Sequence, residues 1–126
     1  MEEKRYFTVE DANACIPKIK PDIFALQKIK EELEKLHGEL KPFIESIPSN
    51  GGHKKTLSLM HAGDEFREIV KRIESHGCHL KGLDPPLLDF PHLRDGKEVY
   101  LCWRFGEDEI RFWHEIDSGF SGRKPL

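Results

Sequence analysis

A long apolar stripe dominates the first half of the chain. Apolar residues recur every three or four positions between residues 19 and 47. They are Ile19, Ile23, Leu26, Ile29, Leu33, Leu36, Leu40, Phe43 and Ile47. This spacing places all of them on one face of an α-helix. Because an isolated helix gains most of its stability from packing, the stripe predicts a long helix that is covered by another part of the protein.

Local signals indicate where this helical region begins and where it is interrupted. Thr8 is a suitable N-cap, and Asp11 stands where the acid of a capping box is expected. Pro17 has no backbone N–H to donate, so we predict a break or kink near residues 14–16. Pro21 would then lie in the first turn of a second, longer segment.

A second, shorter stripe predicts a second helix over residues 53–76. Its apolar residues are Leu57, Met60, Phe66, Ile69, Val70 and Ile73. Residues 48–52 are rich in Pro and Gly and predict a turn between the two stripes, and Gly77 is the expected C′ residue after the second stripe. Two striped helices joined in this way favour an antiparallel, coiled-coil-like hairpin. The shorter helix cannot cover all of the longer one, so the remainder must meet the C-terminal part or a second copy of the chain.

The apolar period changes from 3.6 to 2 in residues 78–126, which is typical of strands. Val99, Leu101, Trp103 and Phe105 alternate with more polar residues, and Ile110, Phe112 and His114 do so after a turn. We predict a hairpin that pairs Phe105 with Ile110, Trp103 with Phe112 and Leu101 with His114. This register places Cys102 across from Trp113 and on the face opposite to His114.

The remaining C-terminal residues complete the expected sheet. Residues 80–90 predict one or two short strands separated at residues 84–86, and residues 118–126 resemble an irregular tail. The predicted fold class is α+β. A long antiparallel helical hairpin (1–77) is followed by a small antiparallel β-sheet (78–126) packed near its open end, and both parts form one domain.

Composition excludes several broad classes of partner. The net charge of −3 argues against a nucleic-acid or membrane-surface footprint, and no apolar run approaches the length of a membrane span. Cys15, Cys78 and Cys102 cannot all pair, which favours a reducing compartment. We therefore expect a cytoplasmic protein.

Several motifs resemble those of a bacterial family of small proteins of unknown function. They are Tyr6-Phe7-Thr8, Ala12-Asn13-Ala14, Asp89-Phe90-Pro91, the stretch from Gly96 to Glu107, Trp113-His114 and Gly119-Phe120. The resemblance extends over nearly the whole chain. It implies a helical hairpin with a small β region, and it implies no particular activity, substrate or cofactor.

Histidine, cysteine and aspartate residues of the C-terminal part suggest a site for a divalent transition metal such as zinc, nickel or ferrous iron. The first candidates are His114, His92 and Asp117, and the further candidates are His79, Asp89 and Cys102. Cys78 and His79 are adjacent and would point to opposite faces of a strand, so they do not share one ion. The alternative is that His114 is a histidine of the core or its rim, bonded to a carbonyl or carboxylate.

The polar face of the expected hairpin is a second candidate site. It would carry Tyr100, Cys102, Arg104, Arg111 and Trp113, with Arg123 nearby in the tail, and aromatic and arginine residues are common at interface centres. Such a face would bind a protein partner or a small ligand, unless it packs against the helices. The three arginines could also converge on an anion in a cleft between sheet and hairpin.

Evidence for catalysis is weak. Cys102 shares its predicted face with arginines, yet a half-buried cysteine beside a tryptophan is more often simple packing. Glu107, Asp108 and Glu109 are expected to be exposed turn acids, and no hydrolase, nucleotide-binding or zincin motif occurs. The sequence thus favours a non-enzymatic interaction module that self-associates, with a small metal-binding protein as the alternative.

Overall fold

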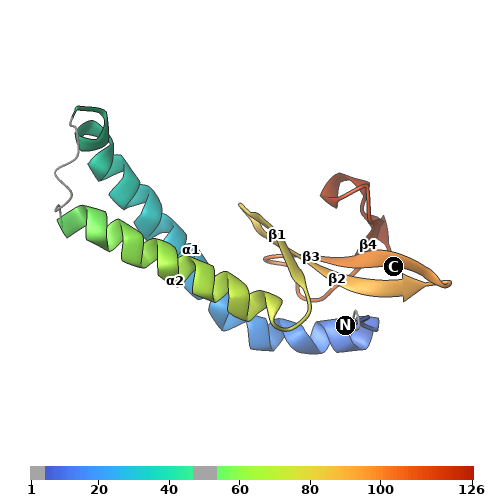
Figure 1. The fold of residues 1–126 in the computed structure, drawn as a ribbon. Coiled ribbons are helices and arrows are strands. Elements are labelled where there is room, and N and C mark those ends of the chain that lie inside the picture. The colour runs from blue at the N-terminus through green and yellow to red at the C-terminus, as the bar shows by residue number, and fades with distance from the viewer. Residues whose placement is uncertain (1–4, 47–53) are drawn as a thin grey trace.

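The protein has two packed helices followed by a five-stranded antiparallel sheet, as the computed structural model shows for residues 5–46 and 54–126 (Figure 1). Helix α1 spans Val9–Ser46 and helix α2 spans Lys54–Glu74. The expected α+β class is confirmed. The turn predicted at residues 48–52 lies outside the described residues. Within the described residues, neither helix combines the length and the apolar character that crossing a membrane requires.

Helix α1 begins where the capping signals predict. The backbone N–H of Asp11 donates to Oγ1 of Thr8 over 3.0 Å, which satisfies one of the free donors of the first turn. The break predicted near residues 14–16 is wrong, because α1 is continuous through Pro17 and Pro21. Both prolines are exposed, and buried residues on the opposite side of α1 hold its neighbouring turns against the rest of the protein. The helix instead changes direction along its length (Figure 1).

The apolar face of α1 has two partners in succession. The first turns of the helix lie beneath the sheet, and its later turns, which carry the apolar stripe, run beside α2 (Figure 1). Ile19, Ile23 and Leu26 are buried in the same cluster as Ile69 and Ile73 of α2. The sheet therefore covers the part of α1 that the shorter α2 does not reach, and it lies near the open end of the hairpin as expected.

The end of α2 packs tightly against the start of the chain. Gly77 adopts a φ of 103°, in the left-handed region that favours glycine, and it terminates the helix as predicted. A Cβ at this position would approach Cζ of Phe7 to 3.0 Å. Phe7 in turn meets Phe90 edge to face, with ring centroids 5.2 Å apart. The close approach of Gly77 thus fixes the position of Phe7 under the sheet.

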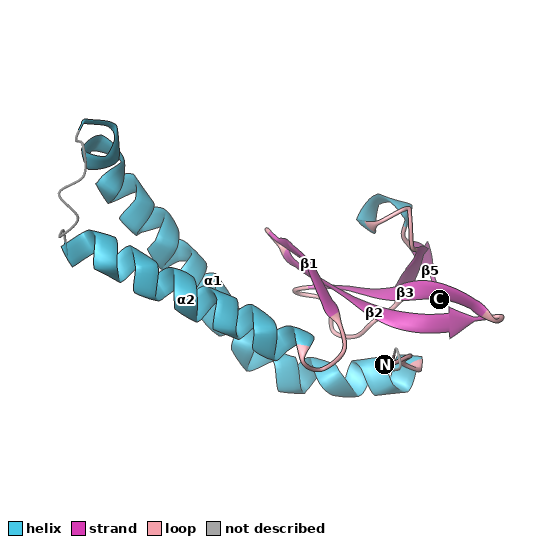
Figure 2. Cartoon of the chain, viewed as in Figure 1, coloured by secondary structure: helices cyan, strands magenta, loops and turns pink. Residues whose placement is uncertain are grey.

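The sheet is a simple meander with the strand order β1-β2-β3-β4-β5 (Figure 2). The strands are β1 (His79–Leu83), β2 (Pro86–Arg94), β3 (Lys97–Arg104), β4 (Phe112–Glu115) and β5 (Lys124–Pro125). The two strands expected around residues 84–86 are present as β1 and β2. The tail is more regular than predicted, because it contains a short 3₁₀ helix, η1 (Phe120–Gly122), and then β5, which pairs with β4.

A two-residue turn sets the register of the two central strands. Asp95 and Gly96 both have positive φ angles, 52° and 78°, as a type I′ hairpin turn requires. The turn pairs Arg94 with Lys97. Continuing that register along the ladder brings Asp89 of β2 directly opposite Cys102 of β3.

The predicted register of β3 and β4 is wrong by one residue. Leu101 pairs with Trp113 and Cys102 pairs with Phe112, so Cys102 does not lie across from Trp113. The connecting loop explains the difference, because Ile110 does not join the ladder. Its backbone N–H donates instead to Oδ1 of Asn13 on α1 over 2.7 Å.

A one-residue shift moves every side chain of a strand to the other face of the sheet. The inner face, toward α1, carries the buried residues Leu88, Phe90, Val99, Leu101 and Trp103. The outer face carries Asp89, Tyr100, Cys102 and His114. His114 and Cys102 therefore share a face, contrary to the prediction.

We expect Asn13→Ala to lower the free energy of unfolding by about 1–2 kcal/mol, because the N–H of the buried Ile110 would lose its acceptor. Urea unfolding measures this loss. Asn13→Asp retains an oxygen acceptor at the same position and is the matched control. Equal stability of the wild type and the alanine variant would contradict this role of Asn13.

Candidate metal site on the outer face of the sheet

Three adjacent strands bring an aspartate, a cysteine and a histidine together on the outer face. Asp89 lies on β2, Cys102 on β3 and His114 on β4, and their potential ligand atoms all lie within 4.8 Å of one another. Asp89 faces Cys102 directly, whereas His114 pairs with Tyr100 and is the diagonal neighbour of Cys102. The three side chains are almost fully buried, with exposed fractions of 4%, 1% and 2%. We call these three residues the outer-face cluster.

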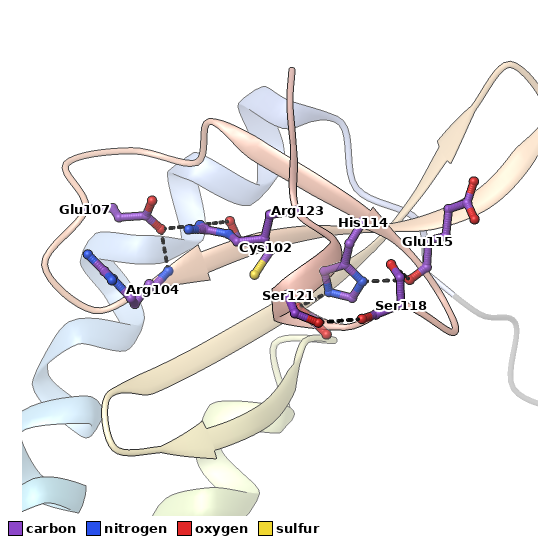
Figure 3. A network of polar contacts seen from close by, with 9 residues as sticks. Cys102, Arg104, Glu107, His114, Glu115, Ser118, Ser121 and Arg123 are labelled. Carbon is purple, nitrogen blue, oxygen red and sulfur yellow. Dashed lines mark hydrogen bonds and ion pairs between the residues drawn. The ribbon is translucent and has the colours of Figure 1, made fainter.

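The imidazole of His114 is held by both of its nitrogens. Nδ1 lies 2.7 Å from the carbonyl oxygen of Glu115 (Figure 3), and Nε2 lies 2.9 Å from Oδ1 of Asp89. A carbonyl oxygen only accepts hydrogen bonds, so Nδ1 carries a proton. Nε2 is thereby directed at the Asp89 carboxylate, and a shared proton or a cation has to complete that contact.

Cys102 is a protonated thiol in this environment. The pKa of its thiol is raised to about 12, mainly by burial and also by the negative charge and hydrogen bond of Asp89, whereas Arg123 opposes the shift. A nucleophilic cysteine needs a lowered pKa and access to solvent. The surroundings of Cys102 therefore do not support thiolate catalysis without an added positive charge.

A cavity of about 300 Å³ adjoins the outer-face cluster. All three residues of the cluster contribute to its lining, together with Tyr100 of β3 and Lys81 of β1. The chain after β4 supplies Ile116, Gly119 and Phe120. The cluster is thus buried in the sheet but borders a space large enough for a small molecule.

Arg123 anchors the C-terminal tail over the outer face. Its Nη2 donates to Oε1 of Glu107 over 2.6 Å and to the carbonyl oxygen of Cys102 over 3.2 Å (Figure 3). Its guanidinium also lies over the rings of Phe112 and Phe120, 4.2 and 4.8 Å from their centroids. These contacts hold the segment that forms one wall of the cavity.

Glu107 is the carboxylate on which this anchor depends. Oε1 also accepts the backbone N–H of Arg104 over 2.6 Å, and the carbonyl oxygen of Glu107 accepts Nε1–H of Trp103 over 3.0 Å. Only 15% of the Glu107 side chain is exposed. The expectation of an exposed turn acid is therefore wrong for Glu107, whereas Asp108 and Glu109 are exposed.

The other predicted metal ligands lie outside the outer-face cluster. His92 is on the inner face, where Nδ1 lies 2.6 Å from the carbonyl oxygen of Phe7. Asp117 is exposed in the chain after β4. His79 pairs with Asp89 across the strands, but its ring packs edge to face on Tyr100, with centroids 5.8 Å apart.

The structure separates the residues of the predicted binding face. Tyr100 and Cys102 line the cavity, and Arg104 is exposed. Trp113 lies on the inner side of the sheet, because it pairs with Leu101, and Arg94 and Lys124 cover its ring. Arg111 pairs with Glu109 and Arg123 with Glu107, so these arginines do not converge on a shared anion site.

The pairing of Asp89 with Cys102 can be predicted from the sequence. Asp95-Gly96 is the strongest short hairpin motif, and counting outward from it pairs Asp89 with Cys102. No local motif predicts which face of the sheet His114 occupies. The register of its strand depends on the hydrogen bond between Asn13 and Ile110, which are far apart in the sequence.

The family model described as "Uncharacterized conserved protein (DUF2203)" matches residues 5–126. The chain belongs to this family. The match includes both helices, the sheet and the outer-face cluster, and it confirms the resemblance to a family of unknown function. No curated protein and no solved structure matches the chain.

The buried thiol of Cys78 gives a prediction for the pH dependence of stability. Burial raises its pKa from 9.0 to about 12, so the stability it contributes is complete below pH 9 and is lost as the pH rises toward 12. We expect the free energy of unfolding of the wild type to fall more steeply over this range than that of Cys78→Ala. Chemical denaturation of both proteins at a series of pH values measures the difference. Parallel curves would contradict the prediction.

Proposed function

We propose that this DUF2203 protein binds a divalent transition metal through Asp89, Cys102 and His114. The observation that carries the proposal is the convergence of three different donor groups in a nearly fully buried cluster. Buried polar groups are costly unless they are fully satisfied, so their concentration on an outer sheet face needs a reason. A bound metal ion provides one.

The three donor groups suit zinc and other divalent transition metals. Zinc is bound in proteins by imidazole nitrogen, thiolate sulfur and carboxylate oxygen. Two ligands at about 2.0–2.2 Å from an ion with tetrahedral geometry are about 3.3–3.6 Å apart. The distance of 2.9 Å between Nε2 of His114 and Oδ1 of Asp89 is shorter than this by about 0.5 Å, so the two side chains would move slightly apart to hold the ion.

The surroundings of His114 also support a ligand role. Histidines that bind metals nearly always donate their other ring N–H to a carbonyl or carboxylate, which fixes the tautomer. Nδ1–H of His114 makes this bond with the carbonyl oxygen of Glu115. Nε2 is left as the ligand atom, and it is directed at Asp89.

Titration of metal-free protein with Co²⁺ tests the proposal. We expect one equivalent to bind and to produce a thiolate-to-cobalt charge-transfer band, because Cys102 would be a ligand. Cys102→Ser should abolish this band, and His114→Ala should weaken binding by at least about 100-fold, the upper range for loss of a supporting residue. Competition with Zn²⁺ would then give the affinity for the preferred ion.

Two matched variants separate the outer-face cluster from other residues of the same type. Cys78→Ser removes a buried thiol outside the cluster, and His92→Ala removes the histidine of the inner face. Both should bind one equivalent of Co²⁺ with the wild-type spectrum, provided that circular dichroism shows a folded protein. A spectrum that depends on Cys78 or His92 instead would overturn the assignment, and so would the absence of binding by the wild type.

A second candidate function is self-association through the helical hairpin. The hairpin extends well beyond the sheet, so its outer part consists of two helices alone (Figure 1). Leu33 and Leu36 of the α1 stripe are only half-buried, and Leu57 and Met60 of α2 are 51% and 60% exposed. A second copy of the chain would cover these residues, as the surplus apolar stripe in the sequence suggested.

Sedimentation equilibrium tests self-association. We expect a dimer whose dissociation constant rises at least about 10-fold in the double variant Leu57→Gln, Met60→Gln, because apolar contact area would be lost. Leu93→Gln changes an exposed leucine of the sheet and is the matched control. A wild type that remains monomeric at all concentrations would contradict this function without affecting the metal proposal.

A further inference from the structure

The cavity beside the outer-face cluster has two chemically different parts. One part consists of the three potential ligands, and the other has apolar walls with a single basic group. The apolar and basic lining residues are Leu87, Ile116, Phe120 and Lys81. A space of about 300 Å³ is at the small end of ligand sites, so it suits a small molecule and not a nucleotide or a large cofactor.

A metal ion held by three protein ligands keeps an open coordination position. Zinc sites with three protein ligands and one exchangeable ligand are the catalytic type, whereas structural sites have four. Within the described residues, the group of potential ligands contains only Asp89, Cys102 and His114. Because all three border the cavity, a molecule in the cavity can reach the open position.

We propose that the cavity binds a small monocarboxylate with an apolar tail. Its carboxylate would coordinate the metal and pair with Lys81, and its tail would lie against Leu87, Ile116 and Phe120. This inference rests on the proposed metal function.

The charges of the lining residues favour a monoanion. A divalent ion is neutralised by one carboxylate and one thiolate, here from Asp89 and Cys102. Lys81 then remains as a positive charge in the lining, and it has no ion-pair partner among the described residues, although its Nζ lies 5.6 Å from the ring centroid of Tyr100. One negative charge on the ligand balances the site, whereas a dianion would leave excess charge beside apolar walls.

The anchored tail contributes the apolar part of this site. Ile116, Gly119 and Phe120 follow β4, and Arg123 holds this segment through Glu107 and through the rings of Phe112 and Phe120. Most of the wall that selects an apolar tail is therefore formed by residues 116–120, with Leu87 of β2 beside them, while the sheet supplies the polar end.

Binding of hexanoate to the Co²⁺-loaded protein tests this proposal. We expect hexanoate to change the ligand-field spectrum of the bound Co²⁺, and calorimetry to show weaker hexanoate binding by metal-free protein. Hexanamide has the same tail without the charge and should leave the spectrum unchanged. Lys81→Gln should bind Co²⁺ like the wild type but weaken hexanoate binding about 5-fold, as expected for loss of an ion pair made by an exposed lysine. Lys97→Gln, which changes a lysine outside the cavity, should retain both affinities.

The outcomes separate this inference from the proposed function. Absence of Co²⁺ binding would overturn the metal site and this ligand together. Co²⁺ binding with a spectrum that hexanoate does not change would overturn the ligand proposal alone. Equal responses to hexanoate and hexanamide, or unchanged hexanoate affinity in Lys81→Gln, would also overturn it.

Discussion

Burial of one face of the sheet against the first turns of α1 is the interaction on which the rest of the structure depends. Trp103, Leu101 and Phe90 are completely buried there, together with Phe7 and Ala12 from the start of the chain. Because neighbouring residues of a strand face opposite sides, a largely apolar inner face leaves the alternate positions free to carry polar groups. The outer-face cluster occupies these alternate positions. The packing of α1 on the sheet thus determines where the site can be.

Much of the architecture could be predicted from local signals in the sequence. The stripe that begins at Ile19 predicts a long helix, Thr8 predicts its start, and Gly77 predicts the end of the second helix. These signals depend on residues close in sequence, whose preferences the fold does not override. The prolines at 17 and 21 are the exception, because packing on the opposite side of α1 keeps the helix continuous there.

The site could be predicted only in part, because its geometry depends on contacts between distant residues. Asp89, Cys102 and His114 were all candidates by residue type, but the predicted register separated His114 from Cys102. The correct register depends on Asn13, which binds Ile110 and keeps it out of the ladder. The structure of the C-terminal tail could not be predicted for the same reason. The contact between Arg123 and Glu107 orders a segment whose composition is typical of a loop.

The two-residue turn at Asp95 and Gly96 has a consequence for how this site can be lost or acquired over time. The donors come from three successive strands, so their alignment depends on turn length as well as on residue identity. A single inserted residue in that turn would rotate Cys102 away from Asp89 while every donor remained in the sequence. Relatives that retain all three residues could therefore differ in metal affinity, and comparison of turn lengths would separate them better than comparison of the donors.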